Sequence, residues 1–360
     1  MTRPLNIVIL GLSLSSSWGN GHATTYRALL RGLAAEGHSV LFLERDAPWY
    51  AAHRDLPAPD FCDFALYDRL SDLWQWRDRI VAADAVILGS YVPEAIAALD
   101  LLAQWVPGRL AFYDIDTPVT LQALKGGDAD YLAQRQLRDI DLYLSFAGGA
   151  AIGQLRQFGA RDAVPLYCSV DPSLYRPMDI TPRWDLGYLG TYSIDRQPGL
   201  EALLLEPARR LPDCRFVVAG AQFPDGIDWP DNVERIEHVA PADHAAFYNA
   251  QRFTLNLTRA AMRAVGHSPS VRLFEAAACG TAILSDRWVG LNEILTPDEA
   301  VVLADYPDDI VTALSMPEAE RTRLAQNARQ SVLEHHTGRA RARELAGHLA
   351  RLRARTEVSA

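Results

Sequence analysis

The sequence has 360 residues, of which 49% are hydrophobic and 22% are charged, a balance typical of soluble globular proteins. This length favours two domains, and the formal net charge of -10 disfavours a surface that binds nucleic acid. No apolar run approaches the roughly 18 residues of a transmembrane segment. The cysteines lack metal-ligand spacing and are typical of a reducing compartment, so we expect a cytoplasmic protein.

The first part of the chain alternates short apolar runs with helical patterns. Runs without polar alternation are typical of parallel strands that are covered on both faces. Such runs predict strands over 6–12, 39–44, 85–89, 109–113 and 142–146. Residues 24–37 have apolar side chains at helical spacing and end at Gly37. This strand–helix–strand start predicts a doubly wound sheet in an N-terminal domain over 1–170.

A proline-rich segment without periodicity, 171–184, is predicted to be a linker. A second alternating series occupies 185–340, with strands expected at 186–190, 215–220, 233–239, 253–258, 281–286 and 300–305. We therefore expect an α/β protein with two Rossmann-like, doubly wound domains that face an interdomain cleft. The basic stretch 341–360 is predicted to form a C-terminal helix that can pack back on the N-terminal domain.

The most informative stretch is GHSPSVRLFEAAACGTAILSD, residues 266–286. Ser268 is predicted to cap a helix that begins at Pro269 and stops at Gly280. Glu275 lies in the middle of this apolar helix and needs a partner if it is buried. Arg272, three residues earlier, can form a purely structural pair with it. Alternatively, Glu275 accepts hydrogen bonds from ribose hydroxyls, while Arg272 or the helix N-terminus holds phosphate.

From Ser268 to Asp286 the sequence resembles the donor-site signature of group-1 glycosyltransferases of the GT-B fold. Within it, the motif SPSVRLFEAAACG looks most like that of the CgeB-like, spore-maturation type. This resemblance implies a nucleotide-sugar donor, with no cofactor and no metal, and it assigns Glu275 to the nucleotide ribose. It also implies that Ser268, Ser270 and Arg272 bind the donor. Retaining members carry a second glutamate, with seven residues between the two, where this chain has His267.

The loop after the first predicted strand contains Gly19 and Gly21, which allow close backbone approach to a ligand. Thr24 stands in place of a third glycine, so this is not a dinucleotide-binding fingerprint. The loop resembles the glycine-rich loop of GT-B transferases, in which a histidine is the general base of some inverting members. The resemblance suggests His22 as the base, with a loop-ordering hydrogen bond as its alternative role.

Arginines are the expected ligands of the donor diphosphate. Because Lys125 is the only lysine, an anion site has to be built from arginines, backbone amides or helix ends. The second domain opens with a strand, Gly190 and then Arg196, where group-1 transferases often place a basic residue on the diphosphate. Arg259 is a second candidate, and a surface residue that caps a loop is the alternative for Arg196. The resemblance places the nucleobase near the turn from His238 to Pro241.

Asp114 and Asp116 form an Asp-x-Asp pair directly after the strand 109–113. In metal-dependent transferases of the other major fold, such a pair binds a divalent cation. Here the pair lies outside the donor signature, so we expect an acceptor-side or catalytic carboxylate, with a structural turn as the alternative. Asp116 is the second candidate for the general base, beside His22.

These features predict transfer of a glycosyl group from a nucleoside diphosphate sugar to a hydroxyl-bearing small molecule, glycan or protein. Arginines and a helix N-terminus would stabilise the departing diphosphate. The alternatives are a sugar-nucleotide epimerase of the same fold and a non-catalytic sugar-nucleotide binding protein. A nicotinamide-dependent dehydrogenase is disfavoured by the missing third glycine.

Overall fold

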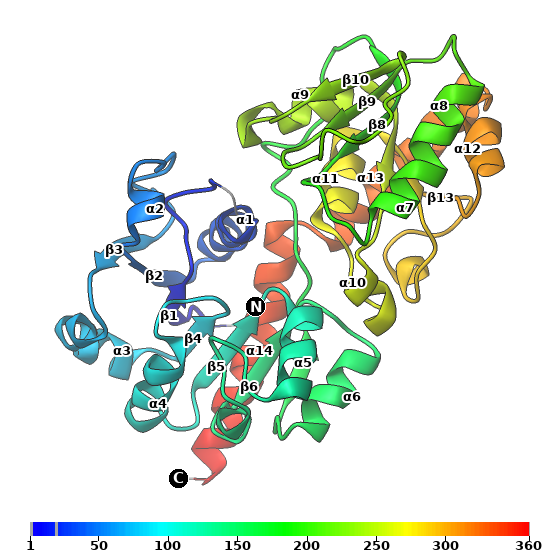
Figure 1. Cartoon of the computed structure of the whole chain (residues 1–360). Coiled ribbons are helices and arrows are strands. Elements are labelled where there is room, and N and C mark those ends of the chain that lie inside the picture. Colours follow the sequence, from blue (N-terminus) through cyan, green and yellow to red (C-terminus); the bar gives the residue numbers. More distant parts are fainter. Residues whose placement is uncertain (1–2, 19–20, 360) are drawn as a thin grey trace. The chain divides into compact units, whose positions relative to one another are not determined.

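The computed structural model describes residues 3–18 and 21–359, which form two compact units, each built on one parallel sheet (Figure 1). The first unit runs to Ser169 and continues from Thr337, and the second comprises Val170–His336. The segment 171–183 has no helix or strand and belongs to the second unit. The predicted α/β class with two parallel sheets is confirmed.

Within the described residues, the first sheet has the strand order β3-β2-β1-β4-β5-β6-β7. Its strands are β1 (Asn6–Gly11), β2 (Ser39–Arg45), β3 (Asp63–Tyr67), β4 (Ala85–Gly89), β5 (Leu110–Asp114), β6 (Leu142–Ser145) and β7 (Ala163–Pro165). The sequence prediction missed the two edge strands, because β3 is only partly buried and β7 has 3 residues. The winding direction reverses between β1 and β4, and ligands of doubly wound sheets bind at the carboxyl ends of such strands.

The helices of the first unit connect these parallel strands. They are α1 (His22–Ala35), α2 (Pro48–Ala51), α3 (Arg77–Ala82), α4 (Ala95–Trp105), α5 (Thr117–Gly126), α6 (Ala150–Gln157) and α14 (Gly338–Ser359), with 3-10 helices η1 (Leu70–Trp76) and η2 (Gln134–Arg138). The apolar stripe of α1 is buried against the sheet, and Gly37 follows the helix with a φ of 84°. That left-handed backbone is the predicted glycine stop.

The last helix, α14, completes the core of the first unit. Leu345 and Leu349 pack in one cluster with side chains of α1 and of the sheet. The contact with α1 is so close that a Cβ on Gly32 would lie 2.2 Å from the carbonyl oxygen of Gly338. A Cβ on Gly338 would lie 2.0 Å from the carbonyl oxygen of Ala28. Both glycines are therefore required by the approach of the two helices.

The second sheet has the order β10-β9-β8-β11-β12-β13 within the described residues, and its winding reverses between β8 and β11. Its strands are β8 (Trp184–Leu189), β9 (Phe216–Ala219), β10 (Val233–Ile236), β11 (Gln251–Asn256), β12 (Ala282–Ser285) and β13 (Val302–Leu303). Each of them overlaps a predicted strand. Leu186, Phe216 and Phe253 are buried in one cluster with Leu203 and Leu204, which fixes the helices of this unit on the sheet.

Several short helices and two longer ones surround the second sheet. They are α7 (Gln197–Leu200), the π-helix η3 (Glu201–Leu205), α8 (Glu206–Arg210), η4 (Pro241–Asp243), α9 (His244–Asn249), α10 (Ala260–Val265), α11 (Val271–Cys279), η5 (Leu291–Glu293), α12 (Pro307–Leu314) and α13 (Glu318–His335). In the part of the chain that the structure describes, no helix combines the length and apolar character needed to cross a membrane.

Candidate active site

A buried arginine is fixed at the switch point of the second sheet. Arg272, in the first turn of α11, donates from Nε to the carbonyl oxygen of Leu189 at 2.8 Å. It also donates from Nη1 to Oδ1 of Asn256 at 3.1 Å. Leu189 ends β8 and Asn256 ends β11, so one guanidinium joins both strands where the winding reverses. The same group lies 5.0 Å from the ring centre of Tyr188.

Two further arginines act electrostatically at this edge. Arg196 is half-buried and donates from Nη2 to the carbonyl oxygen of Thr191 at 2.7 Å, but its buried Nε has no partner among the described residues. Burial lowers the pKa of Arg196, and the charges of Arg272 and of Arg259 lower it further. Arg259 is exposed at the N-cap of α10. Three like charges and an unpaired buried donor form a group that an anionic ligand would stabilise.

The loop after β8 brings its backbone close to these arginines. A Cβ on Gly190 would lie 2.9 Å from Nη2 of Arg272, so only glycine fits there without a shift. Oδ2 of Asp195 accepts from the backbone N–H of Ala260 at 2.7 Å, which ties the loop to the start of α10. Gln197, directly after Arg196, has a buried Oε1 without a partner among the described residues.

The helix α11 begins two residues later than predicted. Val271 is its first residue, and Ser270 instead of Ser268 is the N-cap, with its Oγ accepting from the backbone N–H of Arg272 at 3.4 Å. Ser270 is extended, with a ψ of 142°, so its hydroxyl can reach the first turn. Ser268 is buried in the segment before the helix. The predicted left-handed stop at Gly280 is confirmed, with a φ of 75°.

Glu275 is buried, with 5% of its surface exposed, and Tyr248 donates its hydroxyl to Oε2 of Glu275 at 3.0 Å. The hydroxyl of Tyr175 lies 3.4 Å from Nδ1 of His244. Burial and the charge of Glu275 raise the pKa of both tyrosines. The interpretation of Glu275 and Arg272 as a structural ion pair is wrong for the described residues, because Arg272 turns to the strand ends and Tyr248 donates to the carboxylate.

His267, which occupies the position of the missing glutamate, has left-handed backbone with a φ of 44°. Its Nδ1 lies 3.0 Å from Oε2 of Glu293, which belongs to η5. A carboxylate is therefore present beside this position, although it comes from a later part of the chain. The turn from His238 to Pro241, predicted to hold the nucleobase, follows β10 at the same edge of the sheet.

A histidine, a tyrosine and an aspartate lie at the carboxyl edge of the first sheet. His22 is the first residue of α1, Tyr91 follows β4, and Asp116 follows β5 as the N-cap of α5. The rings of His22 and Tyr91 meet edge to face, with centroids 5.4 Å apart. The hydroxyl of Tyr91 donates to Oδ2 of Asp116 at 3.1 Å. Tyr91 has a φ of 63°, an unfavourable backbone for a bulky residue that points to a functional constraint.

His22 is buried in its neutral form. Burial lowers the pKa of its imidazole to about 4, so the ring is neutral near pH 7. Its buried Nδ1 has no hydrogen-bond partner among the described residues. Gly21 is the N-cap of α1, and Gly19 lies outside the described residues.

Asp114 lies deeper than Asp116 and is fully buried. It accepts hydrogen bonds from Tyr143 at 2.6 Å and Thr120 at 2.9 Å, and burial raises its pKa to about 6. The hydroxyl of Thr120 lies 2.6 Å from that of Tyr131, whose ring centre is 4.4 Å from that of Tyr91. A polar contact and a ring contact thus lead from Asp114 to the tyrosine that bonds Asp116. No three His, Cys, Asp or Glu side chains in the described part of the chain are grouped as metal ligands.

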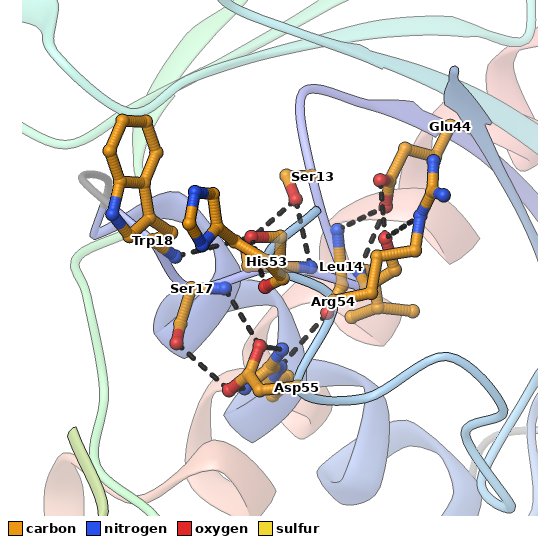
Figure 2. A network of polar contacts seen from close by, with 11 residues as sticks. Ser13, Leu14, Ser17, Trp18, Glu44, His53, Arg54 and Asp55 are labelled. Carbon is orange, nitrogen blue, oxygen red and sulfur yellow. Dashed lines mark hydrogen bonds and ion pairs between the residues drawn. The ribbon is translucent and has the colours of Figure 1, made fainter. Parts of the chain in front are cut away.

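The loop that leads from β1 to His22 is built on a buried carboxylate. Glu44, in β2, accepts from the backbone N–H groups of Leu14 at 2.6 Å and of Ser15 at 2.9 Å (Figure 2). The hydroxyl of Ser15 donates to the other oxygen of Glu44 at 2.6 Å. Since a buried carboxylate is costly unless it is hydrogen-bonded, these three donors fix the conformation of the loop.

The sequence analysis did not single out Tyr91 and Gln197. Both directly follow features that it did identify, since Tyr91 comes after a predicted strand and Gln197 comes after Arg196. The carboxyl ends of parallel strands share one edge, so the residues after every predicted strand are candidates. Which of them meet depends on the strand order.

Comparison with known proteins supports the predicted class. A family described as Glycosyl transferase-like matches residues 196–347, which include the three arginines and Glu275. No curated protein matches the chain in sequence.

Solved glycosyltransferases share the fold over nearly the whole chain. Sucrose-phosphate synthase from Thermosynechococcus elongatus is 15% identical, with a TM-score of 0.69 over 98% of this chain and 100% of that one. Anabaena Alr3699/HepE, in complex with UDP-glucose, is 12% identical, with a TM-score of 0.64 over 96% and 99%. An alpha-glucosyltransferase in complex with UDP-glucose and DNA is 12% identical, with a TM-score of 0.71 over 97% and 100%. The predicted GT-B fold is confirmed, and the family match supports the predicted glycosyltransferase, while the CgeB-like subtype stays a prediction.

Proposed function

We propose that this glycosyltransferase transfers a sugar from a nucleoside diphosphate donor whose diphosphate is held by Arg196, Arg259 and Arg272. The observation that carries this assignment is the unpaired Nε of Arg196 beside two more guanidinium groups at the switch point of the second sheet. Arginine binds diphosphate with charge-assisted, often paired hydrogen bonds. These charges would stabilise the departing diphosphate more than the bound sugar nucleotide, which is how they accelerate transfer.

Other residues of the second unit would bind the rest of the donor. Gly190 lets the loop backbone approach Arg272, and Ser270 at the start of α11, with Ser268 before it, would supply hydroxyl and backbone donors. Glu275 would accept the ribose hydroxyls. Anabaena Alr3699/HepE and the alpha-glucosyltransferase bind UDP-glucose, so UDP is the first nucleotide to test. The motif SPSVRLFEAAACG supports a CgeB-like subtype.

The first unit would activate the acceptor, with His22 as the general base and Asp116 as the second candidate. In an inverting displacement, the acceptor oxygen bonds to the anomeric carbon while the bond from that carbon to the diphosphate oxygen breaks. The hydroxyl proton moves to the imidazole, and the diphosphate leaves with the electron pair. Burial keeps His22 neutral, which this role needs, and no metal takes part in the proposed step. The net charge of -10 favours an acceptor other than nucleic acid, although the alpha-glucosyltransferase neighbour was solved with DNA.

Calorimetric titration with UDP tests the donor site. Arg196→Ala removes one charge-assisted contact and is expected to weaken binding about 10- to 100-fold, from roughly 1.5–3 kcal/mol per charged hydrogen bond. Arg210→Ala is the matched control, because Arg210 pairs with Asp308 on the surface of the same unit, and this variant should bind UDP like the unmodified protein. Glu275→Gln keeps the size of the side chain. It should weaken the binding of UDP and leave the affinity for inorganic diphosphate unchanged. If Arg196→Ala binds UDP as tightly as the unmodified protein does, the proposed diphosphate site is contradicted.

A turnover assay with UDP-glucose distinguishes a transferase from an epimerase and from a non-catalytic binding protein. UDP release from UDP-glucose that requires an added hydroxyl acceptor identifies a transferase. Epimerised donor would identify an epimerase, and tight UDP binding without turnover over a broad acceptor panel would identify a binding protein.

A further inference from the structure

An exposed aromatic platform lies in the loop before α1. The indole of Trp18 is stacked on the imidazole of His53, with ring centroids 4.6 Å apart and planes 11° from parallel (Figure 2). Trp18 nevertheless keeps 52% of its surface exposed, which is unusual for so large an apolar side chain in an ordered loop. The residue lies four positions before His22 and thus in the loop that ends at the proposed base.

Hydrogen bonds fix the backbone that carries this platform. The hydroxyl of Ser16 accepts from the backbone N–H of Trp18 at 3.3 Å and donates to the carbonyl oxygen of His53 at 2.8 Å, so one side chain links both residues. Ser17 donates twice to Asp55, each time at 2.9 Å, and Arg27 donates twice to the same carboxylate at 2.8 Å (Figure 2). Burial would raise the pKa of Asp55, but these donors outweigh it and hold the pKa well below its usual range. A platform that is ordered in advance loses little entropy on binding.

The surroundings of the indole combine a flat apolar face with polar groups. The side chain of Asp55 is 46% exposed and accepts from the hydroxyl of Ser17, the residue directly before Trp18, so polar groups belong to the same loop network as the indole. A pyranose ring has the matching chemistry, because one face presents C–H groups and its edge presents hydroxyls. The negative face of an indole attracts such C–H groups.

We propose that Trp18 and His53 form a binding platform for a pyranose ring of the acceptor substrate, with the sugar stacked on the indole. This inference rests on the proposed function, because it specifies the class of acceptor that a glycosyltransferase would glycosylate. The platform positions the acceptor and takes no part in proton transfer. Other exposed tryptophans differ, since Trp74 packs edge-on against Trp105 and under the guanidinium of Arg77.

Binding of methyl glycosides tests the platform without requiring turnover. Saturation-transfer NMR with methyl β-D-glucopyranoside, methyl α-D-mannopyranoside and methyl β-D-galactopyranoside should detect at least one ligand of the unmodified protein. Trp18→Ala should lower the affinity for that glycoside about 10-fold, and Trp18→Phe should lower it less because an aromatic ring remains. Trp74→Ala is the matched control, since Trp74 is 59% exposed, and it should leave the affinity unchanged. Circular dichroism verifies that each variant is folded.

A UDP titration of every variant keeps the two proposals separate. UDP binding that is unchanged in Trp18→Ala, together with lost glycoside binding, supports the platform. The platform is overturned if no methyl glycoside binds, if Trp18→Ala binds the glycoside as the unmodified protein does, or if benzyl alcohol competes for Trp18 more strongly than the glycosides. Failure of the unmodified protein to bind UDP would instead count against the proposed donor site.

Discussion

The carboxyl edge of the first sheet gathers an imidazole, phenols and carboxylates, whereas that of the second sheet gathers three guanidinium groups. Both edges lie at the switch point of a doubly wound parallel sheet, between β1 and β4 in one unit and between β8 and β11 in the other. The backbone topology therefore sets where a ligand can bind, and the side chains set which chemistry occurs there.

The two edges should also respond to different conditions. The first edge can change its protonation in mildly acidic solution, because burial raises the pKa of Asp114 to about 6, whereas the lowered pKa of His22, about 4, keeps that ring neutral near pH 7. The arginines of the second edge stay charged at any working pH, so salt that screens them should weaken nucleotide binding there.

The largest expected effect separates catalysis from donor binding. His22→Asn removes the proposed base and should lower kcat by about 10²- to 10⁴-fold, as is usual for loss of a general base. The affinity for UDP should not change, because the donor residues belong to the other sheet. His335→Asn, on the exposed part of α13, is the control and should keep full activity. Retained activity in His22→Asn with loss of activity in Asp116→Asn would assign the base to Asp116.

The next effect concerns stability and pH. The native pKa of His22 is about 4, below the unfolded value of 6.5, so the unfolded state binds the proton first as the pH falls. As the pH falls from 6.5 to 4, His22 should therefore lower the free energy of unfolding by up to about 3 kcal/mol. Asp114 acts in the opposite direction, because its native pKa is raised to about 6 and protonation below that pH favours the folded state.

Urea unfolding of the unmodified protein and of His22→Asn at several pH values isolates the contribution of His22. The difference between the two unfolding free energies should grow in favour of the variant from pH 6.5 to pH 4 and then level off. A difference that is constant with pH would show that the imidazole is not buried in its neutral form.

The smallest expected effect tests the link between His22 and Asp116. Tyr91→Phe keeps the ring beside His22 but removes the hydrogen bond to Asp116, so kcat/KM should fall about 3- to 10-fold, from roughly 1 kcal/mol. If His22 is the base, the acidic limb of the kcat/KM profile should stay in place. An upward shift of that limb would indicate Asp116 as the base, since its carboxylate would have lost a donor.

Much of the fold could be predicted because the decisive signals are local. Short apolar runs predicted all six strands of the second sheet, and the left-handed stop at Gly280 follows from a glycine after an apolar helix. The start of α11 was less certain, because Ser268 and Ser270 both have a capping hydroxyl and only the observed backbone selects Ser270. The edge strand β7 was missed because 3 residues carry too little pattern.

The sequence by itself determined most of the strand and helix pattern, and it fixed that an anion site would have to use arginines, backbone amides or helix ends, since Lys125 is the only lysine. The tertiary structure decided which side chains meet. It directs Arg272 to the ends of β8 and β11, gives Glu275 the hydroxyl of Tyr248 as its partner and sets Tyr91 between His22 and Asp116. These partners are distant in sequence, so no periodicity or spacing encodes them, and they come together only when strand order and core packing fix the elements.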